Sequence, residues 1–202
     1  MKYDPEKHHR RSIRLKGYDY SQAGAYFVTI CTQNRECLFG EIVEGEMRLN
    51  NAGQIVQSVW NELSQHYLGV DIDAFAVMPN HIHGIVVLTS VGAGPCAYPD
   101  GGQPRGVAPT MSMSLPDVVH RFKSMTTTRY RHSYTQNGFR PYPSRLWQRD
   151  YYDHIIRNDD ELNRIREYII NNPLKWEFDR ENPFSVNYNL DYKEYFKGIY
   201  ER

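Results

Sequence analysis

The hydrophobic pattern of the chain begins with β-branched and aromatic runs, which are typical of strands. The run "AYFVTICTQ" (25–33) predicts a strand, and "CLFGEIVEGEMRLN" (37–50) predicts two short strands joined at a Glu-Gly turn. The segment "DIDAFAVMPNHIHGIVVLTS" (71–90) predicts a hairpin, because two apolar runs flank the turn-forming pair Pro79-Asn80. Its second run is apolar on both faces, so we expect a central strand that is covered on each side.

Two segments carry apolar residues at the helical period instead. Between residues 51 and 67 they recur every fourth position, which predicts an amphipathic helix with Asn50 or Asn51 as its cap. A second helix is predicted over residues 115–131, where Ser114 can cap the first turn.

A third helix is predicted to begin at Asn158, because Glu161 three residues later completes a variant of the capping box. We expect it to end at Asn172, since Pro173 disfavours helical geometry in the residue before it. The segment "RLWQRDYYDHIIR" (145–157), which precedes this helix, is rich in aromatic residues and predicts a strand.

The predicted order of elements is strand, helix, hairpin, helix, strand and a final helix. This order is typical of an α+β ferredoxin-like sandwich, an antiparallel sheet with two helices on one face and the last helix on the other. We expect a basic N-terminal arm (1–24), one domain (25–173) and a C-terminal tail (174–202). Within the domain, residues 90–114 are rich in Gly, Pro and Ser and predict a long surface loop.

Composition limits the classes of protein to consider. The 202 residues, 40% of them hydrophobic, suffice for one good-sized domain. No apolar run approaches the ~18 residues that a membrane span requires, and residues 1–17 lack the apolar core of a signal peptide. The cysteines Cys31, Cys37 and Cys96 form no Cys-x-x-Cys pair, which argues against structural zinc and indicates the reducing cytoplasm.

The formal net charge is zero, but basic residues are concentrated in two stretches without acids. Residues 7–16 contain five Lys or Arg, and residues 118–149 contain seven. Phosphate binding depends on local rather than net charge, so this distribution favours a nucleic-acid partner. The alternative is a solvated basic arm without a ligand.

His81 and His83 lie one residue apart in an apolar stretch. Side chains alternate across a strand, so both imidazoles point to the same face and could hold one divalent ion. The alternative is a pair of structural histidines satisfied by backbone or water. In the third helix, Tyr168 and Asn172 lie one turn apart and share a face, so the amide oxygen could supply another ligand beside the phenol. They could equally be a core aromatic and a helix cap.

These motifs resemble those of the HUH-type single-tyrosine transposases, in particular the group that includes the REP-associated tyrosine transposases. "HIH" (81–83) matches the His-hydrophobic-His motif. "WQRDYYDHIIRN…EYIINNPLKW" (147–176) resembles the second signature, in which a helical tyrosine precedes an Asn-Pro ending. The opening "IRLKGYDYSQAGAYFVTICTQNRECLFGEI" (13–42) is also similar, and the Gly/Pro-rich loop looks like an insertion.

The resemblance implies that His81, His83 and Asn172 bind a metal, Mg²⁺ or Mn²⁺, and that Tyr168 is the nucleophile on the catalytic helix. The implied reaction is nicking and rejoining of single-stranded DNA. Attack by the tyrosine leaves a 5′-phosphotyrosine and a free 3′-hydroxyl, which can later reseal the strand without ATP. The absence of a G-x-x-x-x-G-K-[ST] sequence is in keeping with this chemistry.

The resemblance also implies a single-stranded or hairpin DNA partner, a nucleoid-associated place in the cytoplasm, and either a homodimer or a monomer. A basic groove with aromatic residues suits unstacked bases. The predicted contacts to the DNA backbone are Arg10, Arg11, Arg14, Lys16, Arg121, Lys123 and Arg129.

Other interpretations stay open at this stage. One is a non-catalytic hairpin DNA- or RNA-binding protein, although "YFVTICT" lacks the RNA-recognition signature of such sandwiches. Another is a metal-dependent phosphohydrolase that uses water, and a third is an inactivated descendant that only binds hairpins. Tyr151 and Tyr152 are rival nucleophiles, which we rank below Tyr168 because they lie on a strand segment with no amide ligand one turn away.

Overall fold

The computed structural model describes residues 15, 17–90, 113–137 and 145–185. The predicted DNA contacts Arg10, Arg11, Arg14 and Lys16 lie outside the described residues, as does most of the loop predicted at 90–114. No helix within the described ranges is long and apolar enough to cross a membrane.

The main sheet has four antiparallel strands in the order β4-β5-β1-β6. This order places the hairpin partner β5 and the first strand at the centre, which is the ferredoxin-like arrangement predicted from the sequence. The predicted fold class is therefore confirmed. The strands are β1 (Gly24–Cys31), β4 (Val70–Val77), β5 (His81–Leu88) and β6 (Tyr152–Ile156).

A second, two-stranded sheet is formed by β2 (Gly40–Val43) and β3 (Glu46–Leu49). Glu44 and Gly45 connect them, with φ angles of 54° and 79°. Two consecutive positive φ angles are the geometry of a tight hairpin turn whose twist matches the strands. This connection confirms the Glu-Gly turn expected from the sequence.

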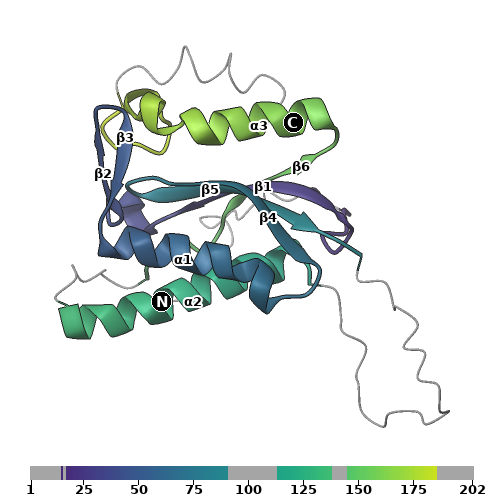
Figure 1. The fold of residues 1–202 in the computed structure, drawn as a ribbon, viewed down its shortest axis with the longest axis horizontal. Helices are drawn as coiled ribbons and strands as arrows, with labels where there is room; N and C mark the ends of the chain where they lie inside the picture. The colour runs from purple at the N-terminus through teal and green to yellow at the C-terminus, as the bar shows by residue number, and fades with distance from the viewer. Residues whose placement is uncertain (1–14, 16, 91–112, 138–144, 186–202) are drawn as a thin grey trace, which may run out of the picture.

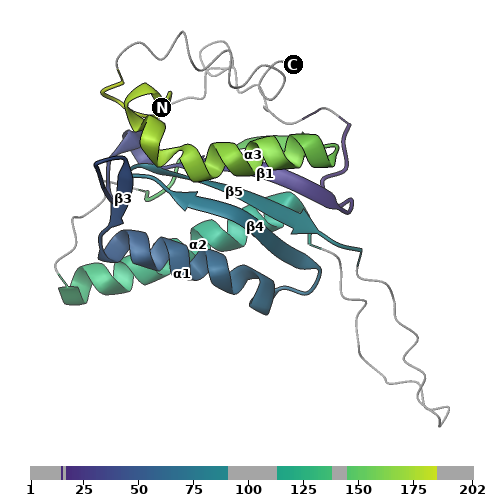
Figure 2. The same ribbon diagram turned by 45° about the horizontal axis from the view of Figure 1, so that its top comes forward.

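Helices cover both faces of the main sheet, with α1 and α2 on one face and α3 on the other (Figures 1 and 2). Asn50 caps α1 by accepting hydrogen bonds from Ala52 and Gly53, and Asn158 caps α3 by accepting one from Glu161. The α-helices and short 3₁₀ helices are α1 (Asn51–His66), α2 (Leu115–Asn137), α3 (Asp159–Asn171), η1 (Gln33–Arg35) and η2 (Pro173–Phe178).

Two segments differ from their predicted extents. Helix α2 continues to Asn137 rather than ending at Arg131, because no Gly or Pro interrupts the chain before Gly138. Only Tyr152–Ile156 of the strand predicted over residues 145–157 is a strand. The strand is interrupted between Gln148 and Tyr152, where the carbonyl groups of residues 148–150 accept hydrogen bonds from the Lys123 ammonium group. Pairing with the end of β1 resumes at Trp147, which bridges to Thr32.

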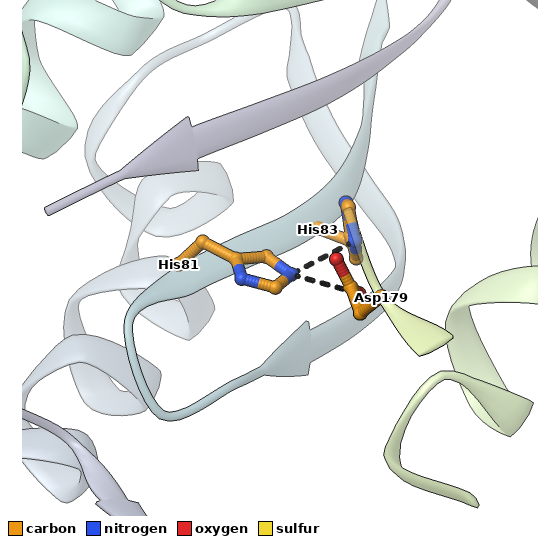
Figure 3. A group of neighbouring side chains, drawn as sticks. All are labelled: His81, His83 and Asp179. Atoms are coloured by element: carbon orange, nitrogen blue, oxygen red, sulfur yellow. Dashed lines mark hydrogen bonds and ion pairs between the residues drawn. The ribbon is translucent and has the colours of Figure 1, made fainter. Parts of the chain in front are cut away.

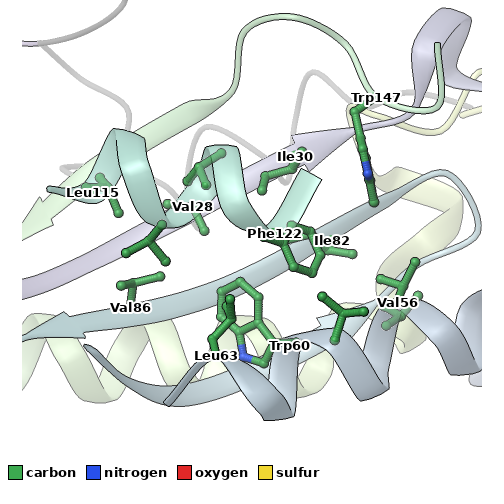
Figure 4. Close-up of a cluster of buried hydrophobic side chains, with 14 of the residues drawn as sticks. Val28, Ile30, Val56, Trp60, Leu63, Ile82, Val86, Leu115, Phe122 and Trp147 are labelled. Atoms are coloured by element: carbon green, nitrogen blue, oxygen red, sulfur yellow. The ribbon is translucent and has the colours of Figure 1, made fainter. Parts of the chain in front are cut away.

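Each face of the sheet has its own hydrophobic core. The larger core fills the space between the sheet and the helix pair α1–α2 (Figure 4). There Trp60 stacks on Phe75 with 4.5 Å between ring centroids. The smaller core joins the sheet to α3 through Phe27, Ile85 and Ile165. Because side chains alternate along β5, the face that carries Ile85 also carries His81 and His83, so both histidines point toward α3.

Candidate active site

The two histidines of β5 meet at their Nε2 atoms. The distance between Nε2 of His81 and Nε2 of His83 is 3.0 Å, and their side chains are fully buried (Figure 3). Strand geometry alone places the two Cα atoms roughly 6.6 Å apart. The imidazoles therefore turn toward each other, as ligands of one ion do.

The Nδ1 atom of each ring is held by a neighbouring side chain. Nδ1 of His81 lies 2.8 Å from Oδ1 of Asn80, and Nδ1 of His83 lies 2.8 Å from the Thr29 hydroxyl on the adjacent strand β1. An amide oxygen can only accept, so the His81 proton sits on Nδ1 and its Nε2 carries a lone pair. Such hydrogen bonds orient metal-binding imidazoles.

Burial keeps both imidazoles neutral. Loss of solvation lowers the pKa of His81 to about 3, and the charge of Arg35 adds to the effect. Burial also holds the pKa of His83 well below its ordinary value, with the neighbouring His81 acting in the same direction. Neutral imidazole is the form that ligates metals, so the site is in the binding-competent protonation state at neutral pH.

Helix α3 brings Tyr168 to the histidine pair. Its hydroxyl lies 3.0 Å from Nε2 of His83, and its ring packs edge-on against Phe27 at 6.0 Å. The apolar contacts of Ile165 and Ile169 with the sheet fix the helix that carries it. The phenol oxygen is therefore next to the nitrogen that would face an ion.

Two oxygen atoms near the end of α3 are buried without hydrogen-bond partners among the described residues: Oδ1 of Asn172 and Oδ2 of Asp179. Asp179 follows the 3₁₀ helix η2, and its Oδ2 lies 3.7 Å from Nε2 of His81 (Figure 3). Because His81 is neutral, this contact is not a charge pair. A buried oxygen without a hydrogen-bond partner costs about 1–3 kcal/mol of folding free energy. A bound cation or water would satisfy each of these two oxygens.

The donor set fits a divalent metal. The ligand atoms of His81, His83 and Asp179 all lie within 4.8 Å of one another. Two neutral imidazoles and a partnerless carboxylate oxygen are groups that bind a divalent ion such as Mn²⁺. Asn172 is buried, and its role as a ligand stays a prediction. The sequence did not single out Asp179, because an acid in a polar C-terminal segment carries no periodic signal.

Comparisons with known proteins point to transposases. A family profile described as "Transposase IS200 like" matches residues 107–172. This range includes Tyr168 and ends at Asn172. An uncharacterised protein of Haemophilus influenzae is 40% identical over 180 residues, which cover 89% of this chain and 96% of that protein. These comparisons indicate an IS200-like transposase-related protein.

Two further proteins that are similar to this chain carry REP-associated names. One is an H. influenzae protein whose name places it among the REP-associated tyrosine transposases. It is 26% identical over 160 residues, which cover 78% of this chain and 74% of that protein. The other is the solved structure of a REP-associated tyrosine transposase bound to a REP hairpin. It matches with a TM-score of 0.50 at 18% identity, over 80% of this chain and 73% of that one, and so shows a common fold.

A cavity of about 200 Å³ lies beside His83. His83, Tyr168 and Asp179 line it, together with Tyr151 and Tyr152, the rival nucleophiles of the sequence analysis. Tyr152 begins strand β6 and pairs with Thr29 in the sheet. The structure therefore brings all three tyrosines to one cavity, and the Tyr168 hydroxyl lies there at hydrogen-bond distance from Nε2 of His83.

The basic residues predicted on α2 have different surroundings. Arg121 is exposed. Lys123 donates to three backbone carbonyls and lies 5.3 Å from the centre of the Tyr151 ring. Arg129 forms two parallel hydrogen bonds to Glu62 on α1, at 2.7 and 2.5 Å. Lys123 and Arg129 thus have intramolecular partners, and their contact with DNA stays a prediction.

Proposed function

We propose that this protein is a metal-dependent transposase that nicks and rejoins single-stranded DNA through a 5′-phosphotyrosine at Tyr168, at sites that contain a hairpin. The observation that carries the proposal is the 3.0 Å distance from the Tyr168 hydroxyl to Nε2 of His83, the atom that also meets His81. A nucleophile and a pair of metal-ligand side chains thus converge from a helix and a strand 85 residues apart.

The metal would be held by His81, His83 and Asp179, with Asn172 as the ligand predicted from the family motif. Mg²⁺ and Mn²⁺ are the ions best matched to phosphate chemistry with oxygen ligands in the set. When bound, such an ion offsets the negative charge that develops on a phosphate during displacement.

Tyr168 supplies the nucleophilic oxygen. Its ordinary pKa is about 10, so the phenol has to lose its proton as it attacks. A bond forms between its oxygen and the scissile phosphorus, the bond from phosphorus to the 3′ oxygen breaks, and that oxygen takes up a proton. The buried side chains of Thr29 and Asn80 meanwhile keep the imidazoles from turning.

Rejoining is the reverse displacement. A 3′-hydroxyl attacks the phosphotyrosine, the phosphodiester forms again and Tyr168 recovers its proton. The number of phosphate ester bonds is conserved in both steps, so no nucleotide hydrolysis is required. This balance explains why a tyrosine, rather than water, suits a strand-transfer reaction.

Hairpin DNA is the proposed substrate because the REP-associated transposase of matching fold was solved with a REP hairpin. The acid-free stretch of residues 118–149 supports a phosphate-rich ligand. Bound single-stranded DNA would bring the phosphate to the cavity beside Tyr168 and His83.

The test is a covalent-trapping assay. The full-length protein is incubated with end-labelled hairpin DNA that carries single-stranded flanks, in the presence of Mn²⁺, and resolved on a denaturing gel. We expect a protein–DNA adduct that Tyr168→Phe abolishes and that the matched controls Tyr151→Phe and Tyr152→Phe retain. Cleavage without any adduct would instead identify a water-using hydrolase, and binding without cleavage would identify a passive hairpin binder.

A further inference from the structure

We propose that a basic groove between α2 and residues 145–149 binds the single-stranded DNA flank that leaves the catalytic cavity; the inference rests on the proposed function. The groove encloses about 520 Å³. None of the described residues that line it is acidic. Its cationic side chains are Lys123, Arg131, Arg145 and Arg149, with His120 beside them.

The groove adjoins the cavity of Tyr168, and Gln148 separates the two. Gln148 lines both, and the residues that follow it divide between them: Arg149 lines the groove, and Asp150 lines the cavity. A strand whose phosphate lies at Tyr168 can therefore reach the groove by crossing one residue.

Gln148, the residue between the groove and the cavity, is fixed by hydrogen bonds to the end of β1. Its backbone N–H donates to the carbonyl of Cys31 at 2.9 Å, and its side-chain amide donates to the carbonyl of Thr32 at 3.1 Å. The Lys123 ammonium group also donates to the carbonyls of residues 148–150, at 3.0–3.2 Å. Because Gln148 is fixed, a DNA strand that crosses it would meet the same surface between the cavity and the groove.

The chemistry of the groove suits a sugar-phosphate backbone. Trp147 is 4% exposed, and its indole N–H donates to Thr126, so its ring is not presented for base stacking. The accessible groups are instead the cations and the hydroxyls of Ser124 and Thr128. Contacts of this kind position a strand without reading its sequence.

The other sides of the cavity are less suited to a polyanion. Arg35 pairs with Glu181 at 3.0 Å, which offsets its charge. Asp179, which also lines the cavity, adds an acidic side chain on this side. A stem also has to end before its strand enters the cavity, so the occupant of the adjoining groove is the unpaired flank rather than the duplex.

The experiment measures binding by the Tyr168→Phe protein, in which no adduct can form, to hairpins with and without a single-stranded flank. The test variant adds Arg145→Ala and Arg149→Ala, which remove two exposed charges from the groove. The matched control adds Arg48→Ala and Arg164→Ala, which remove two exposed charges from β3 and α3.

We expect the groove variant to weaken binding of the flanked hairpin alone. The slope of log affinity against log salt should fall by about 1.4, because each single-strand phosphate that a cation neutralises contributes about 0.7 to it. An equal weakening for the hairpin without a flank would assign the groove to the stem and overturn the inference. So would an unchanged slope, or an equal effect of the control. Failure of the wild-type protein to form an adduct would count against Tyr168 chemistry and leave this binding result intact.

Discussion

The side-chain oxygen of Asn80 accepts a hydrogen bond from Nδ1 of His81 at 2.8 Å. The amide cannot turn over, because its nitrogen donates to the carbonyls of Arg35 and Glu181 at 3.1 and 2.7 Å. The proton of neutral His81 is therefore fixed on Nδ1, and Nε2 faces His83 as a lone pair. A residue of the β4–β5 turn thus sets the tautomer of a proposed metal ligand.

The Thr29 hydroxyl orients the His83 ring through its contact with Nδ1. This role can be tested with Thr29→Val, which keeps the shape of the side chain and removes its hydroxyl. We expect Mn²⁺ affinity to fall roughly 10–100-fold, the usual effect of losing such an orienting hydrogen bond. Isothermal titration calorimetry measures the affinity, and Thr128→Val, an exposed position on α2, is the control. An affinity equal to that of the control would remove Thr29 from the site.

Asp179→Asn tests the ligand that the sequence did not reveal. Without the carboxylate, Mn²⁺ affinity should fall about tenfold or more, and the stabilisation that Mn²⁺ gives against thermal unfolding should shrink accordingly. When EDTA removes the metal, the thermal unfolding temperature of the variant should be no lower than that of wild type. The reason is that the substitution removes the charge of a buried, partnerless oxygen. Glu177→Gln, on the exposed side of η2, is the matched control. Undiminished Mn²⁺ binding would leave Asn172 as the oxygen ligand.

The pair Glu62–Arg129 should contribute stability that depends on pH. Hydrogen bonds from Arg129 lower the pKa of Glu62 to about 2 from its ordinary 4.5. A carboxylate with a lowered pKa in the folded state stabilises fully above its unfolded pKa and loses that contribution as the pH falls from 4.5 to about 2. Since both side chains are partly exposed, Arg129→Ala should cost about 1 kcal/mol at pH 7.

Urea unfolding of wild type and Arg129→Ala across this pH range measures the effect. The difference in unfolding free energy should disappear near the acid end, and a constant difference would contradict the ion-pair explanation. Hairpin affinity of the same variant separates this structural role from the predicted DNA contact. A reduced salt slope would show that Arg129 also reaches a phosphate.

Gly84→Ala should destabilise the fold through overpacking. A Cβ at Gly84 would lie 2.4 Å from Cζ2 of Trp60 and 3.1 Å from Cδ2 of Phe75. Forcing these rings apart should lower the free energy of unfolding by about 1–3 kcal/mol, as urea denaturation can measure. Trp60→Phe removes the indole atoms nearest to the new methyl group, so the double variant should cost less than the sum of the single costs. Strict additivity would exclude this clash.

Most of the fold was predictable because its elements depend on local sequence. The caps Asn50 and Asn158 and the Glu44-Gly45 turn lie where the pattern predicts them. The end of α2 was placed too early, and the strand before α3 was placed too broadly because a distant residue contacts it. Residues 148–150 interrupt the predicted strand where Lys123 on α2 binds their carbonyl groups. Such a contact has no signature in the segment itself.

The sequence by itself determined which side chains share a face. The spacing of His81 and His83 on a strand, and of Tyr168 and Asn172 on a helix, follows from backbone periodicity. Only the tertiary structure decided that these faces meet, with the Tyr168 hydroxyl 3.0 Å from His83, and that Asp179 joins them. The physical reason is that periodicity is fixed within a few residues. Convergence instead depends on how α3 packs on the sheet through Phe27, Ile85 and Ile165.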